Sequence, residues 1–153
     1  MRTIEPWVAA PLERFLQESQ ARLVLLTTSS GQVVAQHGFS RSLDVMAASS
    51  LGAGIMASTS ALADLMGSSG FGTIVHEGTR QSLILAAIDT PRGRWLGLVV
   101  FGRETTVGLV QLFWNVLARE LLARMPATVN APPKRAETFE RDLDASLRSL
   151  FGR

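Results

Sequence analysis

The sequence predicts an α/β (α+β) fold, in which a five-stranded antiparallel sheet is sandwiched between helices. Three β-like runs between residues 71 and 101 are joined by connections of three or four residues, which are long enough only for hairpins. Residues 83–88 and 96–101 are apolar without alternation, so both faces of the sheet should be covered there. Helical periodicity over residues 9–19, 43–66 and 106–125 supplies the covering layers.

Length and composition set limits on the class of protein. The 153 residues suffice for one domain with a real core. Hydrophobic residues make up 46% and charged residues 18%, as expected for a protein that buries surface in an assembly. The net charge is only +2 and the basic residues are dispersed, so nucleic acid is not an expected partner.

The cysteine count and the first residues bear on chemistry and location. Without cysteine the chain has no disulfide, thiolate metal site or cysteine nucleophile. The start, MRTIEPWVAAPLERF, lacks the long apolar core of a signal peptide. We therefore expect a cytoplasmic protein.

The first elements are a helix and a hairpin. Residues 9–19 place apolar side chains on one face of a helix that tolerates Pro11 in its first turn. Residues 22–28 and 33–37 then form two strands around the turn Ser29-Ser30-Gly31-Gln32. Ser42 is the expected N-cap of the next helix, with Asp44 at the positive end of its dipole.

The central helix, residues 43–66, carries no charge between Val45 and Ala63. One stripe has larger apolar residues and is predicted to face the sheet: Leu43, Ala47, Leu51, Ile55, Ser58, Leu62 and Leu65. A second stripe is mostly small: Val45, Ala48, Gly52, Met56, Thr59 and Ala63. Either the helix is buried inside the domain, or another chain covers its second face. Because the domain is small for enclosing a helix, we expect another chain to cover the small stripe. Four serines, a threonine and two glycines argue against a membrane span, and a lone Gly-Ala-Gly against a nucleotide loop.

The second half is a three-strand meander, then a helix and an appended segment. Residues 71–77 are glycine-interrupted and polar, as suits an edge strand, and residues 81–89 and 94–101 follow. The helix over 106–125 is expected to bury Val110, Phe113, Leu117 and Leu121, broadened by Leu109, Leu112 and Val116. It should share one face of the sheet with the first helix, leaving the other to the central helix. The expected divisions are a domain at 1–125, a proline-containing linker at 126–136 and an amphipathic helix at 137–153.

No pattern indicates catalysis, a cofactor or a metal. His37 and His76 lack companions at ligand spacing, and no serine stands in a G-x-S-x-G elbow. Asp44 and Asp64 are roughly 30 Å apart along a helix, too far for paired acid–base work. Arg80, Arg92 and Arg94 flank the meander turns; they are either solvated turn residues or contacts to acidic groups of a partner.

The order of these patterns resembles the roadblock / dynein light chain family of small longin-like domains, over about residues 12–124. The resemblance rests on order and spacing, since each pattern alone is an ordinary strand or helix. The segments that carry it are Val24-Leu25-Leu26, Gly31, Val33-Val34-Ala35, residues 43–51 (LDVMAASSL), Gly67, Ile74-Val75, Leu83-Ile84-Leu85, residues 95–100 (WLGLVV) and 106–110 (TVGLV).

The resemblance implies a non-enzymatic homodimer that regulates or scaffolds a Ras-like small GTPase, as in the family's bacterial branch. In that family the central helices of two subunits pack together and the first meander strand pairs with its symmetry mate. Carried over, the dimer interface is Ala48, Gly52, Met56, Thr59, Ala63, Thr73 and Val75. The alternative is a small-molecule-sensing or protein-assembly adaptor domain, for which Gly52, Gly54 and Phe39 are the only pocket hints.

Overall fold

The computed structural model describes residues 2–3, 6–38, 44–68 and 72–125, together with Ala145 and Arg148. The predicted appended segments, 126–136 and 137–153, fall outside this part of the chain apart from those two residues, and so do Leu43, Ser42 and Phe39. The elements are β1 (Arg2–Thr3), the 3-10 helix η1 (Pro6–Val8), α1 (Ala9–Ser19), β2 (Leu23–Thr28), β3 (Val33–Gly38), α2 (Val45–Leu65), β4 (Thr73–Glu77), β5 (Ser82–Thr90), β6 (Gly93–Phe101) and α3 (Val107–Arg124).

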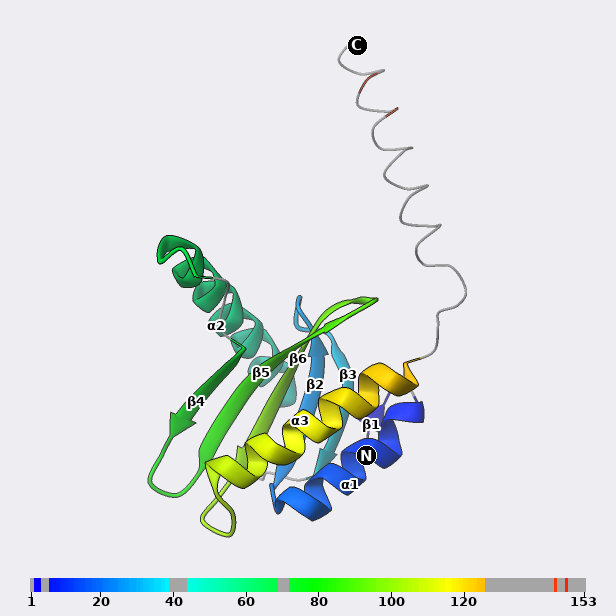
Figure 1. Cartoon of the computed structure of the whole chain (residues 1–153), viewed down its shortest axis with the longest axis vertical. Helices are drawn as coiled ribbons and strands as arrows, with labels where there is room; N and C mark the ends of the chain where they lie inside the picture. Colours follow the sequence, from blue (N-terminus) through cyan, green and yellow to red (C-terminus); the bar gives the residue numbers. More distant parts are fainter. Residues whose placement is uncertain are drawn as a thin grey trace.

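All strands pair antiparallel in one sheet, in the order β1-β3-β2-β6-β5-β4. The five predicted strands, the meander β4–β5–β6 and the position of β4 at an edge are confirmed (Figure 1). The two-residue strand β1 adds a sixth member beside β3. It escapes sequence analysis because two residues are too short to show any periodicity.

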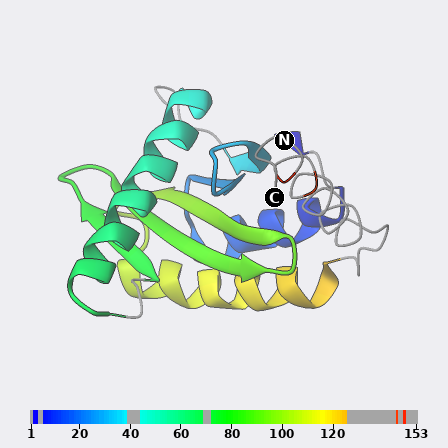
Figure 2. The same ribbon diagram turned by 90° about the horizontal axis from the view of Figure 1, so that it is seen from above.

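The helices cover both faces of the sheet, as predicted. Helices α1 and α3 lie side by side on one face and α2 crosses the other (Figures 1 and 2). The larger core lies under α1 and α3, where Phe15 and Trp114 meet edge to face with ring centroids 6.2 Å apart. Gly97 of β6 lets Trp114 approach the sheet, because a Cβ at Gly97 would overlap the indole ring.

A smaller core lies between α2 and the sheet. It contains alternate residues of the central strands together with two residues of α2: Leu23, Leu25, Leu85, Leu96, Leu98, Val100, Ala48 and Met56. The intervening residues of the same strands point to the opposite face and fill the larger core, so the central strands have no polar face. This explains why their sequences do not alternate.

The two long helices begin at side-chain caps. Asp44 Oδ1 accepts hydrogen bonds from the Met46 and Ala47 amides, both at 3.1 Å, so Asp44 is the N-cap of α2 rather than Ser42. Thr106 Oγ1 accepts from the Leu109 amide at 3.2 Å and caps α3.

Helix α3 departs from its predicted burial. Val110, Trp114, Leu117 and Leu121 face the core, whereas Leu109, Leu112 and Val116 are exposed. The helix therefore buries a narrower stripe than its composition suggests.

Candidate functional site

The two faces of α2 are the reverse of the prediction. The residues buried against the sheet are Ala48, Ser49, Gly52, Met56 and Ala63. Small residues lie inward because the helix crosses close to leucines of the sheet: a Cβ on Gly52 would be 3.4 Å from Leu85 Cδ2 and 3.8 Å from Leu98 Cδ1. A larger side chain at Gly52 would push the helix away from the sheet at this crossing.

The larger apolar residues of α2 point outward. Leu51 is 68% exposed, Leu62 53% and Leu65 86%. Among the described members of the stripe predicted to face the sheet, only Ile55 packs on the core. We define the outer stripe as the exposed residues at alternating spacings of four and three, with Leu62 beside them: Ala47, Leu51, Gly54, Ser58, Ala61, Leu62 and Leu65.

This reversal corrects the helical part of the predicted dimer interface. Ala48, Gly52, Met56 and Ala63 are buried within their own chain, so they are not available to a second one. Thr59 is half-buried and its hydroxyl donates to the Ile55 carbonyl at 2.8 Å. The helical surface that can meet a partner is the outer stripe.

The edge strand β4 exposes a free row of backbone groups. The Ala87 amide donates to the Gly72 carbonyl at 3.1 Å, so Gly72 and Ala87 form a hydrogen-bonded pair. Because bonded and non-bonded pairs alternate along an antiparallel ladder, Ile74 is bonded to β5, whereas Thr73 and Val75 are not. Thr73 and Val75 therefore direct their N–H and C=O groups away from β5, as strand pairing with a second copy requires. Within the described residues no strand lies on that side of β4.

A groove of about 560 Å³ runs between α2 and the sheet beside this edge. Its lining is mostly apolar, from Leu51, Gly52 and Ile55 on the helix to leucines of β5 and β6, with Asp44, His76 and Glu77 at its border. Gly54, the other glycine of the predicted pocket, does not line it, and a Cβ at Gly54 would have no atom within 4 Å.

The three predicted partner-contacting arginines are not brought together. Arg92 and Arg94 lie at the β5–β6 turn, where Arg94 Nε pairs with Asp89 at 2.9 Å. Arg80 lies in the β4–β5 turn, at the other end of β5, about 26 Å away at 3.3 Å per residue. Arg80 instead borders a hollow with Arg22 and Arg103, which the sequence did not reveal because the three come from separate segments.

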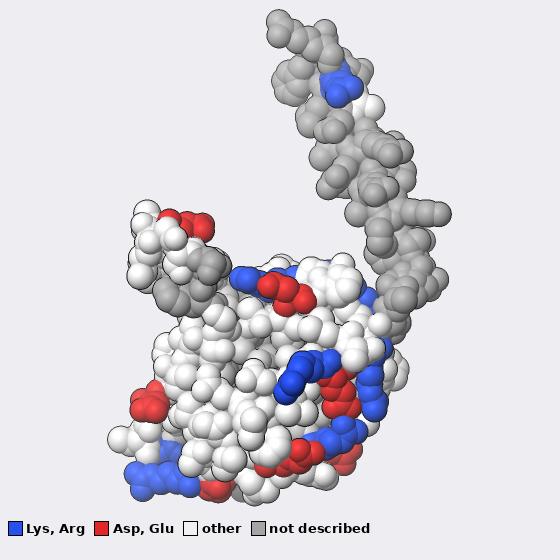
Figure 3. Space-filling view, viewed as in Figure 1, with Lys and Arg blue, Asp and Glu red and all other residues white. Residues whose placement is uncertain are grey.

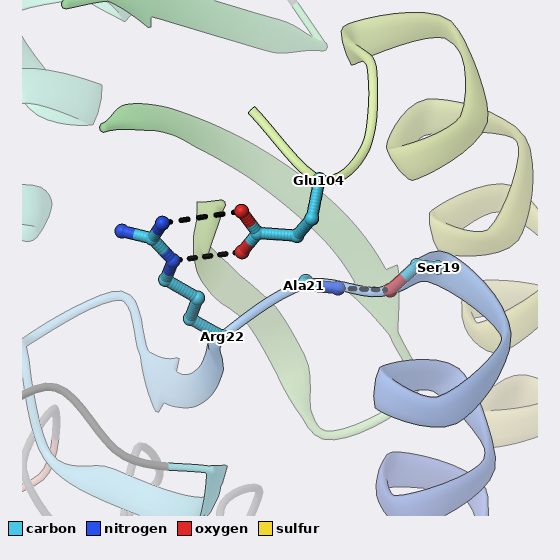
Figure 4. Close-up of polar contacts among 4 residues, drawn as sticks. All are labelled: Ser19, Ala21, Arg22 and Glu104. Carbon is cyan, nitrogen blue, oxygen red and sulfur yellow. Dashed lines mark hydrogen bonds and ion pairs between the residues drawn. The ribbon is translucent and has the colours of Figure 1, made fainter. Parts of the chain in front are cut away.

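Arg22 is held by Glu104 of the β6–α3 loop. Its Nε and Nη2 donate to the two carboxylate oxygens at 2.7 and 3.1 Å (Figure 4). This hydrogen bonding lowers the pKa of the Glu104 carboxyl and raises that of the Arg22 guanidinium. A hydrogen bond to Glu120 raises the pKa of Arg14 and ties α1 to α3.

Two further properties bear on the site. Among the described residues no three His, Asp or Glu side chains come together as a metal site would need. Helix α2 is long and apolar enough to cross a membrane by length and composition alone, although core helices pass the same test. Its inward face is seated on the sheet.

The comparisons with known proteins identify the fold. No family model and no curated protein matches the sequence. Among solved structures, MglB of Myxococcus xanthus is 28% identical with a TM-score of 0.72, over 80% of this chain and 97% of that one. The gliding protein MglB of Thermus thermophilus is also 28% identical, with a TM-score of 0.66, over 76% and 86% of the two chains. The chain has the roadblock/longin-like fold of these structures.

A more distant structure also shares the fold of this chain. A Roadblock/LC7 domain from Streptomyces avermitilis is 16% identical with a TM-score of 0.63, over 75% of this chain and 92% of that one. The two MglB structures are more similar to this chain than this one is, in both sequence identity and TM-score.

Proposed function

We propose that this chain forms a homodimer through the outer stripe of α2 and the free edge of β4, and that the dimer regulates or scaffolds a Ras-like small GTPase. The observation that carries the proposal is the adjacency of two unpartnered surfaces. Leu51, Leu62 and Leu65 are exposed on a helix that lies beside an unpaired strand. One twofold-related copy could cover both.

The apolar part of this surface is large enough to support association. Burying one leucine side chain contributes roughly 1.5–3 kcal/mol, and the outer stripe offers three. The small residues between them, Gly54, Ser58 and Ala61, would let two helices approach closely. Self-association also agrees with a solved MglB that has a tetrameric arrangement.

The GTPase partner follows from the family resemblance and from the MglB neighbours. The proposed role is non-enzymatic, and the dimer would act by positioning the GTPase's own residues. We further propose a cytoplasmic location without membrane insertion, since α2 is used to cover the sheet and a second copy.

The test is binding to a purified Ras-like GTPase of the same organism, loaded with GTP or GDP. The proposal expects a complex that prefers one nucleotide state and a changed rate of GTP hydrolysis. Absence of binding in both states would contradict the GTPase assignment and leave the dimer untouched. A change in hydrolysis distinguishes activation from scaffolding.

A second candidate function is small-molecule sensing, which the groove under α2 favours. Its volume, about 560 Å³, lies within the usual range of ligand sites, and its lining combines apolar side chains with a few polar ones. A thermal-shift screen against metabolites tests it. A compound that raises the melting temperature of the native chain but not of a Leu83→Glu variant, which blocks the groove, would support this function.

A further inference from the structure

A hollow bordered by three arginines lies at the β4–β5 end of the sheet. Its volume is about 820 Å³, and its lining is Arg22, Gly78, Thr79, Arg80, Gln81 and Arg103. The arginines come from the segment before β2, from the β4–β5 turn and from the loop after β6. None of the six lining residues is acidic. Figure 3 shows basic side chains gathered over the β4–β5 turn, at the lower left.

The three guanidinium groups differ in how far their charge is compensated. Arg22 shares its charge with Glu104 through two hydrogen bonds. Arg103 Nε donates to the Thr79 carbonyl at 3.2 Å, which positions the group without neutralising it. Within the described part of the chain, Arg103 has no carboxylate partner and Arg80 makes neither an ion pair nor a hydrogen bond. Two positive charges therefore border the hollow without a carboxylate partner among the described residues.

Hydrogen bonds within the chain already position the guanidinium groups of Arg22 and Arg103 around the hollow. The bidentate Arg22–Glu104 pair fixes one side, and a Cβ at Gly102 would overlap that pair, so the backbone lies directly against it. The Arg103–Thr79 bond links the β6–α3 loop to the β4–β5 turn on the other side. Positioning the donors before binding reduces the entropy lost when an anionic group is held.

The size and neighbourhood of the hollow indicate the class of ligand. Guanidinium forks match planar carboxylates through two parallel hydrogen bonds. The volume is at the upper end of that seen for ligand sites, so it leaves room for several linked groups rather than one small ion. Gly78 and Gln81 line both this hollow and the apolar groove, so a bound chain can pass from one to the other.

We propose that the hollow docks a short acidic segment of a protein partner, whose Asp or Glu carboxylates pair with Arg80 and Arg103 and whose adjoining apolar residues reach toward the groove. Arg80 and Arg103 belong to neither the outer stripe nor β4, so the charged part of the contact is separate from the proposed dimer interface. The groove, by contrast, shares Leu51 with the outer stripe. The hollow gives the domain a second, charge-selective interaction surface.

Fluorescence anisotropy of labelled peptides with the full chain tests this proposal. The probe is Glu-Glu-Glu-Glu-Leu-Leu, and its neutral counterpart has glutamine in place of glutamate. The double variant Arg80→Ala/Arg103→Ala should bind the acidic probe about tenfold more weakly, as loss of two charge-assisted contacts implies. The matched control is Arg92→Ala/Arg94→Ala, which removes the same charge from the opposite turn and should bind like the native chain. Circular dichroism verifies that both variants fold.

The outcomes separate a built site from general electrostatics. Equal weakening by both double variants would show that only net charge matters, and would overturn the proposal. So would equal binding of the neutral peptide, or displacement by excess inorganic phosphate, which would indicate a simple anion site. The variant Arg80→Lys/Arg103→Lys keeps the charge but not the guanidinium fork. Its affinity for the acidic probe should lie between those of the alanine double variant and the native chain, as recognition of carboxylates by guanidinium groups implies.

Discussion

Gly52 and Gly54 stand two residues apart on α2 and face opposite environments. A Cβ at Gly52 would lie 3.4 Å from Leu85 Cδ2 under the helix, whereas a Cβ at Gly54 would have no atom within 4 Å. One glycine thus allows the helix to approach its own sheet, and the other lies on the surface that we assign to a second chain. Substitutions at these two positions can therefore test folding and association separately.

Gly52→Glu should unfold or strongly destabilise the domain, while Gly54→Glu should not. The first places a carboxylate against leucines of β5 and β6, and an unpaired buried charge costs roughly 3–5 kcal/mol. The second adds an exposed side chain in open space. Thermal unfolding followed by circular dichroism measures the difference, and equal melting temperatures would contradict the assignment of the two helix faces.

The edge of β4 can be tested with proline. Val75→Pro removes an N–H that points away from β5, so the fold should persist while the dimer dissociates about tenfold more readily. Ile74→Pro, the matched control, removes an N–H that faces β5 and should destabilise the sheet itself. Sedimentation at several concentrations, with melting curves for both variants, gives the result. A Val75→Pro dimer of native affinity would exclude strand pairing.

The approach of Trp114 to Gly97 predicts a site that is sensitive to one methyl group. Gly97→Ala would drive a Cβ into the buried indole and should cost about 1–3 kcal/mol in the free energy of unfolding. Gly108→Ala in α3, where no atom lies within 4 Å of the added Cβ, should instead be neutral or stabilise by about 0.5–1 kcal/mol. Denaturant titration of the two variants checks this, and the same sign for both would refute the packing described.

The Arg22–Glu104 pair predicts an acid-sensitive contribution to stability. Because the pKa of Glu104 is lower in the folded chain than its ordinary value of 4.5, the pair stabilises the fold fully above that value. The contribution is lost as the pH falls through the lowered, folded-state pKa. Melting temperatures of the native chain and of Glu104→Gln should therefore converge in acid. A gap between them that stays constant from neutral to acid pH would contradict the prediction.

The overall fold could be predicted from the sequence because its signals are local. Short hairpin connections, unbroken apolar strands and helical spacing determine the meander and its two helical layers. The faces of α2 could not be assigned in this way, since both stripes lack charge and only the distance between helix and sheet decides between them. Size alone favours the larger residues inward, yet Leu85 and Leu98 of the sheet lie close under the helix and leave little room for a side chain at Gly52.

The arginine hollow was also beyond sequence analysis. The place of Arg80 in a turn marks it as a candidate contact, but its neighbours in space, Arg22 and Arg103, lie far from it in the chain. The edge strand itself, by contrast, follows from the sequence pattern. Thr73 and Val75 are carried over onto it from the family resemblance, and they lie where their backbone groups face away from β5. Their pairing with a second copy remains a prediction.

Sedimentation equilibrium of the native chain and of Leu51→Lys/Leu62→Lys tests the central claim most directly. Both leucines are exposed in the single chain, so lysines there should leave its melting temperature nearly unchanged. Placed in a helix–helix contact, the two charges should abolish association. The account predicts a dimer for the native chain and a folded monomer for the variant. A native monomer, or a variant that dimerises with native affinity, would contradict it.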